Sequence, residues 1–442
     1  MSHPPPQPLL RRGPRPLLLH LMLASLRSTI SLASLANVWA GSNGGWPTWK
    51  AGALKAGASK AGASKAGAAE AQAIIDALAA LARESGAATA RQVDGAAGFA
   101  AAVVRELGAA DRALIAGIAA YRRHPYVRLV PEPPAIWAEG GTRLLDYGIP
   151  GEGGATPLLV VPSLINRAYV LDLAEGASFL RWLAAHGTRP LLLDWGWPEA
   201  AEREFTLTDY IAGRLLRAAQ AAAAAAGPAV LCGYCMGGTM TIAAAAQRPD
   251  LFRALALFAA PWDFHAPDGG AQGASLAAAA PLMEPLFAFN GTLPVDALQL
   301  LFAALDPYAI ADKYRSFART DQASARAEKF VALEDWLNDG VPLAAPVART
   351  CLSEWYGRND PARGAWRVAG LAVRPQAIGL PAFVAIPARD RIVPPESATA
   401  LADRLPHATV LRPAAGHIGM VAGLSAERAL WLPFREWLST LA

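Results

Sequence analysis

Short apolar runs separated by longer helical stretches make up the chain from about residue 135 to its C-terminus. Residues 157–161 form a continuous apolar run, as expected of a central strand that is buried on both faces. Because runs of strand length alternate with stretches of helix length, we predict a mostly parallel, doubly wound sheet of the α/β class. The predicted strands are 142–147 (antiparallel), 157–161, 189–194, 230–232, 254–260, 382–386 and 409–411.

The alternation of strands and helices stops between residue 264 and about residue 370. The sequence there is mostly helical, and it lies where folds of this class carry a lid over the site. We therefore predict a catalytic domain over residues 131–442, with a helical lid insertion at about 264–370.

A different pattern occupies the first 130 residues. Residues 50–68 repeat Lys-Ala-Gly-Ala with a period of five residues, and the glycine and lysine of each repeat oppose packing. We predict a disordered low-complexity extension over residues 1–68 and a helical N-terminal region over residues 69–130. That region is either a small subdomain or a module that binds a partner or a surface, and its pattern does not decide between them.

An apolar run at residues 17–26 follows several arginines. It resembles the core of a signal peptide, but His20 and Arg27 interrupt the pattern and no Ala-x-Ala cleavage site follows directly. A surface-seeking amphipathic segment is the alternative. No apolar run reaches about 18 residues without a charge, so we predict no transmembrane span.

Composition and charge narrow the classes of function. The chain has 40 Lys and Arg against 36 Asp and Glu, a net charge of +4, and shows no basic stripe with interleaved aromatic residues. We therefore predict no nucleic-acid partner. Three cysteines give no disulfide framework, which favours a reducing, cytoplasmic location.

The residues Gly233-Tyr-Cys-Met-Gly237 follow a predicted strand and precede an alanine-rich helical stretch. This arrangement matches the G-x-S-x-G nucleophile elbow of the α/β-hydrolase fold, with Cys235 in place of serine. The two glycines leave room for a tight turn that projects the thiol above the sheet. Cys232 and Cys235 also form a C-x-x-C pair, but Cys232 lies inside the strand, where its thiol is expected to be buried and inert.

A nucleophile on this elbow needs a base and a carboxylate that orients the base, and the fold supplies them in the chain order nucleophile, acid, histidine. His417 lies in a glycine-flanked loop after the last predicted strand, where the fold carries its base. Asp390, which follows the strand 382–386, is the predicted acid, and Asp263 is its rival. His407 is predicted to be a surface residue.

These residues predict acyl transfer through a thioester. His417 would deprotonate Cys235 with help from the dipole of the following helix, and the thiolate would attack an acyl carbonyl. Backbone N–H groups of Met236 and of the loop near Leu164 are the predicted oxyanion hole. A second acceptor would then take the acyl group. With water as that acceptor, the protein would instead be a thiol-dependent hydrolase.

Over residues 130–442 the chain resembles the polyhydroxyalkanoate synthases, most of all the shorter type that works with a separate helper subunit. The elbow alone is a weak signal, whereas an ordered series of matching segments is highly specific. The segments are Ser163-Leu-Ile-Asn-Arg-Ala-Tyr169, Leu193-Asp-Trp-Gly196, Thr206-Leu-Thr-Asp-Tyr-Ile211, Gly233-Tyr-Cys-Met-Gly-Gly-Thr239, Pro261-Trp-Asp-Phe264, Gly291-Thr-Leu-Pro294, Leu305-Asp-Pro-Tyr308, Glu334-Asp-Trp-Leu-Asn-Asp339, Asp390-Arg-Ile-Val-Pro-Pro395 and Gly416-His-Ile-Gly419.

The resemblance implies that Cys235 carries the growing hydroxyacyl chain as a thioester, with His417 as base and Asp390 as its partner. It implies 3-hydroxyacyl-CoA as substrate, release of CoA, no further cofactor or metal, and a polyester that collects as cytoplasmic granules. Asn166 and Arg391 would contact the substrate. A helper subunit or a homodimer is left open. The alternatives are a polyester depolymerase or hydrolase and a catalytically silent granule-associated protein.

Two departures from the family pattern stand out. Histidine directly follows the acid in the family, and Arg391 stands at that position here. Its guanidinium would either hold Asp390 in a salt bridge, bind a phosphate of CoA, or mark a changed activity. The region before residue 130 has no counterpart in the pattern, and it would either replace a helper subunit or dock on one.

Overall fold

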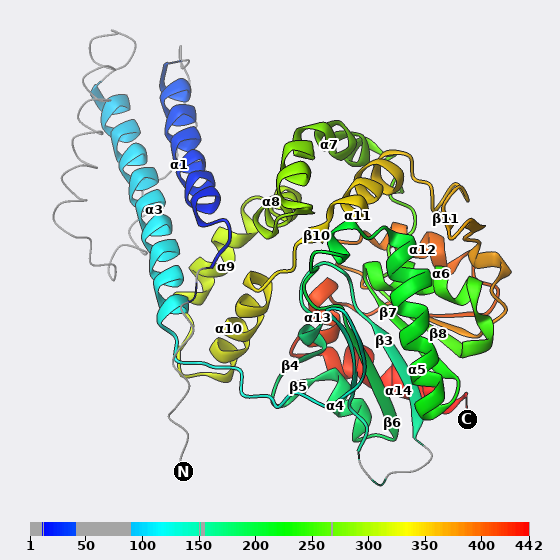
Figure 1. Cartoon of the computed structure of the whole chain (residues 1–442). Coiled ribbons are helices and arrows are strands. Elements are labelled where there is room, and N and C mark those ends of the chain that lie inside the picture. The colour runs from blue at the N-terminus through cyan, green and yellow to red at the C-terminus, as the bar shows by residue number, and fades with distance from the viewer. Residues whose placement is uncertain are drawn as a thin grey trace. The chain divides into compact units, whose positions relative to one another are not determined.

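The computed structural model describes residues 11, 13–40, 90–149, 151, 155–266 and 268–441 of the 442-residue chain. The chain divides into two compact units. The sheet unit comprises Pro125–Leu305 and Glu328–Ala442. The helical unit comprises Leu10–His124 and Asp306–Ala327. Figure 1 labels the elements of both.

The sheet unit is built on an eight-stranded sheet with the order β1-β2-β6-β3-β7-β8-β13-β14. β2 pairs antiparallel with β1 and β6, whereas all the other neighbours in this sheet are parallel. The predicted α/β class with a mostly parallel sheet is therefore confirmed. The strands are β1 (Ala135–Glu139), β2 (Thr142–Asp146), β3 (Thr156–Val161), β6 (Thr188–Asp194), β7 (Ala229–Tyr234), β8 (Phe252–Phe258), β13 (Ala382–Ala385) and β14 (Ala408–Leu411).

Two hydrophobic cores lie on the two faces of this sheet, because successive side chains of a strand point to opposite faces. In β3, Leu159 and Val161 belong to one core, and Leu158 and Val160 belong to the other. Burial on both faces is thus the reason for the continuous apolar run at residues 157–161.

Helices cover both faces of the sheet (Figure 1). One core includes residues of the π-helix Asp209–Leu215, α5 (Leu216–Ala226), α6 (Met236–Gln247) and α12 (Pro395–Ala402). The other includes residues of α4 (Phe179–Ala184), α13 (His417–Ala422), the π-helix Glu427–Trp431 and α14 (Leu432–Ser439). A short pair of strands, β4 (Asp172–Ala174) and β5 (Ala177–Ser178), precedes α4.

Two elements differ from the sequence prediction. β1 was not predicted, because its burial alternates between exposed and half-buried positions and leaves no apolar run. The alanine-rich stretch 208–226, whose length and composition predict one α-helix, begins as the π-helix Asp209–Leu215 and only then continues as α5. Neither difference moves the strands that carry the candidate site residues.

Between β8 and β13 the chain is mostly helical. The helices there are α7 (Ala271–Asn290), α8 (Val295–Leu305), α9 (Ala309–Phe317), α10 (Ala325–Asn338), α11 (Ala345–Arg349) and the π-helix Thr350–Gly357. Two short antiparallel pairs interrupt them, β9 (Thr292–Leu293) with β10 (Leu343–Ala344) and β11 (Arg367–Val368) with β12 (Leu371–Ala372). α9 belongs to the helical unit.

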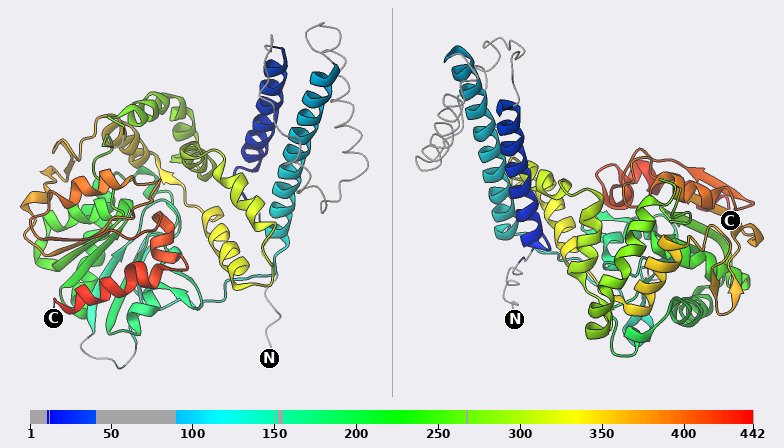
Figure 2. Two further views of the ribbon diagram at one scale, coloured as in Figure 1. Left: turned by 180° about the vertical axis from the view of Figure 1, so that it is seen from behind. Right: turned by 90° about the horizontal axis from the view of Figure 1, so that it is seen from above.

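In the helical unit, α1 (Leu17–Ala40) and α3 (Ala90–Arg123) lie side by side, and α9 packs on α3 (Figure 2). A Cβ at Gly117 would lie 1.9 Å from the backbone oxygen of Tyr314, so only glycine lets α3 and α9 approach this closely. The rings of Tyr121 and Tyr314 meet edge to face with centroids 5.7 Å apart.

The helix α1 corrects part of the prediction of disorder over residues 1–68. Its leucine- and alanine-rich sequence has high helix propensity, and α3 gives it a surface to pack on. The repeat at residues 50–68 and the first part of the predicted helical region, residues 69–89, lie outside the described residues. Among the described helices, none combines the length and the apolar character that crossing a bilayer requires.

Candidate active site

The turn between β7 and α6 holds Cys235 in a strained backbone conformation. Its φ and ψ are 57° and −130°, a combination that residues with a side chain rarely adopt. The Cys235 N–H donates to the Phe258 carbonyl, and the Cys235 carbonyl accepts from the Gly238 N–H, each at 2.8 Å. These bonds fix the turn and leave the half-buried thiol just before the first turn of α6.

Glycine is required on both sides of this cysteine. A Cβ at Gly237 would lie 2.1 Å from the Val161 carbonyl oxygen, and a Cβ at Gly233 would lie 2.4 Å from the Cα of Gly238. Real side chains do not fit at such distances, so α6 can start against β3 and β7 only with glycine at both positions. The elbow spacing seen in the sequence thus has a steric cause.

His417 and Asp390 meet from two loops at the carboxyl ends of neighbouring strands. His417 is the first residue of α13, and its Nδ1 donates to Asp390 Oδ2 at 2.7 Å. Asp390 Oδ1 accepts the backbone N–H groups of Ile392 at 2.8 Å and Val393 at 2.9 Å. Both side chains are buried. The carboxylate is therefore held by its own loop and orients the imidazole.

The pKa of His417 responds to two neighbouring side chains. Burial of the ring lowers this pKa, but the electrostatic influence of Cys235 and the hydrogen bond to Asp390 outweigh burial and raise the pKa to about 10. An imidazolium in this place stabilises a thiolate beside it. The structure thus joins Asp390 and His417 directly, and Cys235 lies close enough to act on the charge of His417.

The two predicted oxyanion-hole residues lie beside the elbow. Met236 is the first residue of α6, so its N–H has no carbonyl of its own helix to bond. Leu164 is buried in the loop that follows β3, and β3 is the neighbour of β7 in the sheet. In the same loop, the Ile165 N–H donates to Ser163 Oγ at 3.0 Å.

The two predicted substrate contacts have different surroundings. Asn166 has a positive φ of 67°. Its Oδ1 contacts the segment after α10, because a Cβ added to Gly340 would lie 3.3 Å from this oxygen. Arg391 is exposed and directly follows the buried Asp390.

The rival acid Asp263 has other partners. Its Oδ1 accepts from Asn359 Nδ2 at 2.8 Å and from the His265 N–H at 2.9 Å. His407, predicted as a surface residue, is exposed. These residues are therefore not brought to the contact between Asp390 and His417.

The three cysteines have different environments, and all three are free thiols. Cys232 is fully buried in the strand, and burial raises the pKa of its thiol well above the usual value. Burial also raises the pKa of Cys351, to about 12. Of the three thiols, Cys235 is the one whose charge influences the pKa of His417.

Tyr234 contacts His417 and was missed in the sequence analysis. Its hydroxyl donates to the main-chain carbonyl of His417 at 3.2 Å. Its position in the sequence could have indicated this contact. The residue before an elbow nucleophile is the last residue of its strand, so it lies at the same edge of the sheet as the loop that carries the catalytic histidine.

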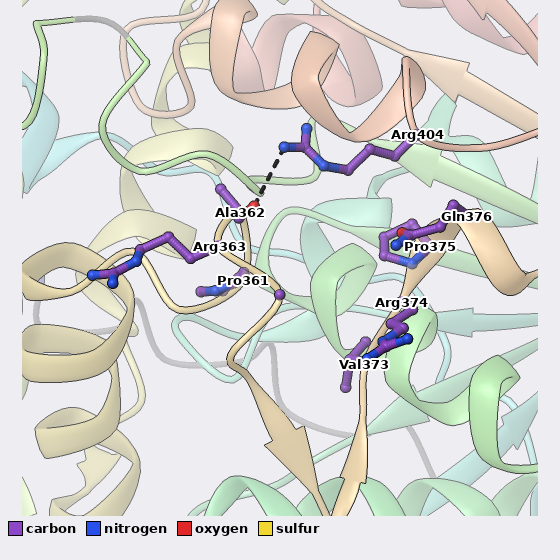
Figure 3. Close-up of a pocket in the computed structure, with 9 residues that line it drawn as sticks. Pro361, Ala362, Arg363, Val373, Arg374, Pro375, Gln376 and Arg404 are labelled. Atoms are coloured by element: carbon purple, nitrogen blue, oxygen red, sulfur yellow. Dashed lines mark hydrogen bonds between the residues drawn. The ribbon is translucent and has the colours of Figure 1, made fainter.

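One described pocket of about 290 Å³ lies apart from these residues (Figure 3). It is lined by Pro361, Ala362, Arg363, Gly364, Val373, Arg374, Pro375, Gln376 and Arg404. Arg404 donates to the Ala362 carbonyl at 3.3 Å, whereas the guanidinium of Arg363 extends away from the other labelled residues (Figure 3). The pocket therefore offers no convergent set of donors.

Comparison with known proteins supports a single family. A family model described as the alpha/beta hydrolase fold matches residues 185–423. A "Poly(3-hydroxyalkanoate) polymerase subunit PhaC" from Synechocystis is 30% identical over 292 residues, which are 64% of this chain and 77% of that protein. The protein of the same name from Allochromatium vinosum is 29% identical over 317 residues, covering 69% of this chain and 87% of that one.

Among solved structures, the fold is similar to that of a "Putative non-heme bromoperoxidase BpoC from Mycobacterium tuberculosis". The identity is 19% and the TM-score is 0.42, with 72% of this chain and 100% of that chain covered.

Proposed function

The chain belongs to the poly(3-hydroxyalkanoate) polymerase family of α/β-hydrolase-fold proteins, and we propose that it polymerises 3-hydroxyacyl groups taken from coenzyme A. The growing chain would be held as a thioester on Cys235. One observation carries this proposal: a buried carboxylate, Asp390, bonds His417 at 2.7 Å, next to an elbow whose cysteine acts electrostatically on the same imidazole.

In the first half-reaction, the Cys235 thiolate attacks the carbonyl carbon of a 3-hydroxyacyl-CoA. A new carbon–sulfur bond forms to the enzyme, the bond to the CoA sulfur breaks, and His417 gives its proton to the departing CoA thiolate. The raised pKa of His417 fits this role, because the ring is charged while it waits beside the thiolate.

In the second half-reaction, the hydroxyl of another hydroxyacyl group attacks the thioester. His417 accepts the hydroxyl proton, an ester bond forms, and the carbon–sulfur bond to Cys235 breaks. Asp390 keeps the imidazole in the tautomer that can accept at the nitrogen facing Cys235. The polymer therefore grows by one ester for each CoA released, and no metal or further cofactor takes part.

Charge develops on the acyl oxygen in both steps. The backbone N–H groups of Met236 and Leu164 are the donors that we assign to it, because both residues flank the elbow. Asn166 and Arg391 are assigned to the acyl-CoA. The exposed guanidinium of Arg391 suits a phosphate of CoA.

We further propose that residues 264–370 act as a lid over this site, that the product collects as cytoplasmic granules, and that a helper subunit or a second copy takes part. Exclusion of water under such a lid would favour the hydroxyl of a hydroxyacyl group over water as the acceptor of the acyl group. Cys235 already packs against both hydrophobic cores, which supports a site of low water content.

The test is to supply the purified protein with 3-hydroxybutyryl-CoA and to follow CoA, free 3-hydroxybutyrate and sedimentable polyester together. We expect CoA release matched by ester bonds in insoluble polymer. Free acid that appears at the rate of CoA release would contradict the polymerase and identify a hydrolase.

A further inference from the structure

Tyr234 links the strand of Cys235 to the loop of His417. Its hydroxyl donates to the main-chain carbonyl of His417 at 3.2 Å in a buried environment. The rings of Tyr234 and His417 lie 5.1 Å apart and are tilted by 31°. The tyrosine is only 4% exposed, so this contact forms within the core.

Strand pairing alone does not hold His417 near Cys235. The sheet order places β8 and β13 between β7, which ends at Tyr234, and β14, which leads to His417. Asp390 fixes the rotation of the imidazole through Nδ1, but its bond does not fix the backbone of His417. The Tyr234 hydroxyl holds that backbone, and it does so from the residue directly before Cys235.

We propose that Tyr234 is a positioning residue that holds His417 in place beside the elbow of Cys235. The hydroxyl does not touch the reacting atoms. It acts on geometry, because a displacement of the base by a fraction of an ångström weakens proton transfer and the thiolate contact. The proposal rests on the proposed function only for the roles of Cys235 and His417.

The competing explanation is ordinary packing, since a buried tyrosine hydroxyl usually finds an acceptor. Tyr147 provides a matched control. Its hydroxyl donates to Asp172 Oδ2 at 3.1 Å and it is 8% exposed, so it too makes a buried bond. Tyr147 follows β2, which runs antiparallel to β6, and therefore lies at the end of the sheet opposite to the elbow.

The experiment compares Tyr234→Phe and Tyr147→Phe in the full chain. Each change removes one hydroxyl and keeps the ring. For Tyr234→Phe we expect kcat of CoA release to fall about tenfold with KM changed less than about twofold, because only the geometry of the base is altered. For Tyr147→Phe we expect a lower melting temperature and an unchanged kcat.

The second readout is the titration of His417, followed by NMR of 13C-labelled histidine rings and assigned by the signal lost in His417→Gln. Its pKa, raised in the wild type by the charge of Cys235, is expected to fall in Tyr234→Phe because that charge is then farther away. Tyr147→Phe should leave it in place. An unchanged His417 titration and kcat in Tyr234→Phe would overturn the proposal, as would equal changes in both variants.

A third readout does not require polymerase activity. Iodoacetamide at pH 6–7 should label Cys235 more slowly in Tyr234→Phe. Cys232 is protected by burial, and the half-buried Cys351 reacts slowly because its pKa is raised to about 12. Labelling of Cys232 marks unfolded molecules and so corrects for any loss of fold. If the wild type releases no CoA, the proposed function fails, yet the labelling and the titration still decide the role of Tyr234.

Discussion

In both the sheet unit and the helical unit, a glycine allows two backbone segments to approach closely, but the structural consequence differs. In the sheet unit, a Cβ at Gly237 would lie 2.1 Å from the Val161 carbonyl oxygen, and in the helical unit a Cβ at Gly117 would lie 1.9 Å from that of Tyr314. The first approach starts a helix directly behind a strained cysteine. The second brings two helices together around a pair of tyrosine rings.

Close packing therefore supports catalysis only where it brings a nucleophile next to a base. At the elbow the neighbour is Cys235, which acts electrostatically on the His417 ring that Asp390 holds. In the helical unit the neighbours are the rings of Tyr121 and Tyr314. The two units also differ in burial, because the strands of the sheet are covered on both faces, whereas α1 leaves large apolar side chains such as Leu18 and Met22 exposed.

The largest effect is expected at the nucleophile. Cys235→Ser should lower the rate of CoA release by about a thousandfold or more, because a hydroxyl beside histidine is a much weaker nucleophile near neutral pH. The matched control is Cys232→Ala, which removes a fully buried thiol three positions earlier and should reduce stability while the folded protein stays active. Full activity of Cys235→Ser would refute the thioester route.

Removal of the charge on Asp390 comes next. Asp390→Asn should lower kcat by about 10³- to 10⁴-fold, because the amide favours the wrong tautomer of His417 and cannot stabilise the imidazolium. Asp263→Asn is the control, since that side chain bonds Asn359 and the His265 N–H instead. Steady-state assays that gave the larger loss for Asp263→Asn would reverse the assignment of the acid.

The same substitution at Gly237 in the sheet unit and at Gly117 in the helical unit tests the comparison between the two units directly. Gly237→Ala and Gly117→Ala should each lower the free energy of unfolding by about 1–3 kcal/mol, because the added carbon overlaps a carbonyl. We expect only Gly237→Ala to slow Cys235 alkylation as well, since it displaces the elbow. Equal alkylation rates in the two variants would show that the elbow tolerates the carbon.

The smallest effect is expected on the exposed side of α1. Met22→Ser should change the free energy of unfolding by less than about 0.5 kcal/mol, because the side chain is 69% exposed. Leu114→Ala, at a position that is 1% exposed on α3, should cost about 2–5 kcal/mol in the same denaturant titration. A large loss for Met22→Ser would mean that a partner or another segment covers this face.

The sequence predicted the sheet unit better than the helical unit. Doubly buried strands such as β3 leave continuous apolar runs, and the glycines of the elbow mark a turn that few other sequences can make. The half-exposed β1 leaves no such run and was missed. In α1, exposed apolar residues are mixed with the buried His20 and Ala24, so the pattern did not reveal which face packs on α3.

By itself the sequence determined the place of Cys235 on an elbow and the order of acid and histidine behind it, because these features depend on neighbours along the chain. Only the tertiary structure decided that Asp390, and not Asp263, bonds His417, and that Tyr234 reaches the same residue. Those contacts join positions 27 and 183 residues apart. Their geometry depends on the order in which strands pair across the sheet, and local sequence patterns do not encode that order.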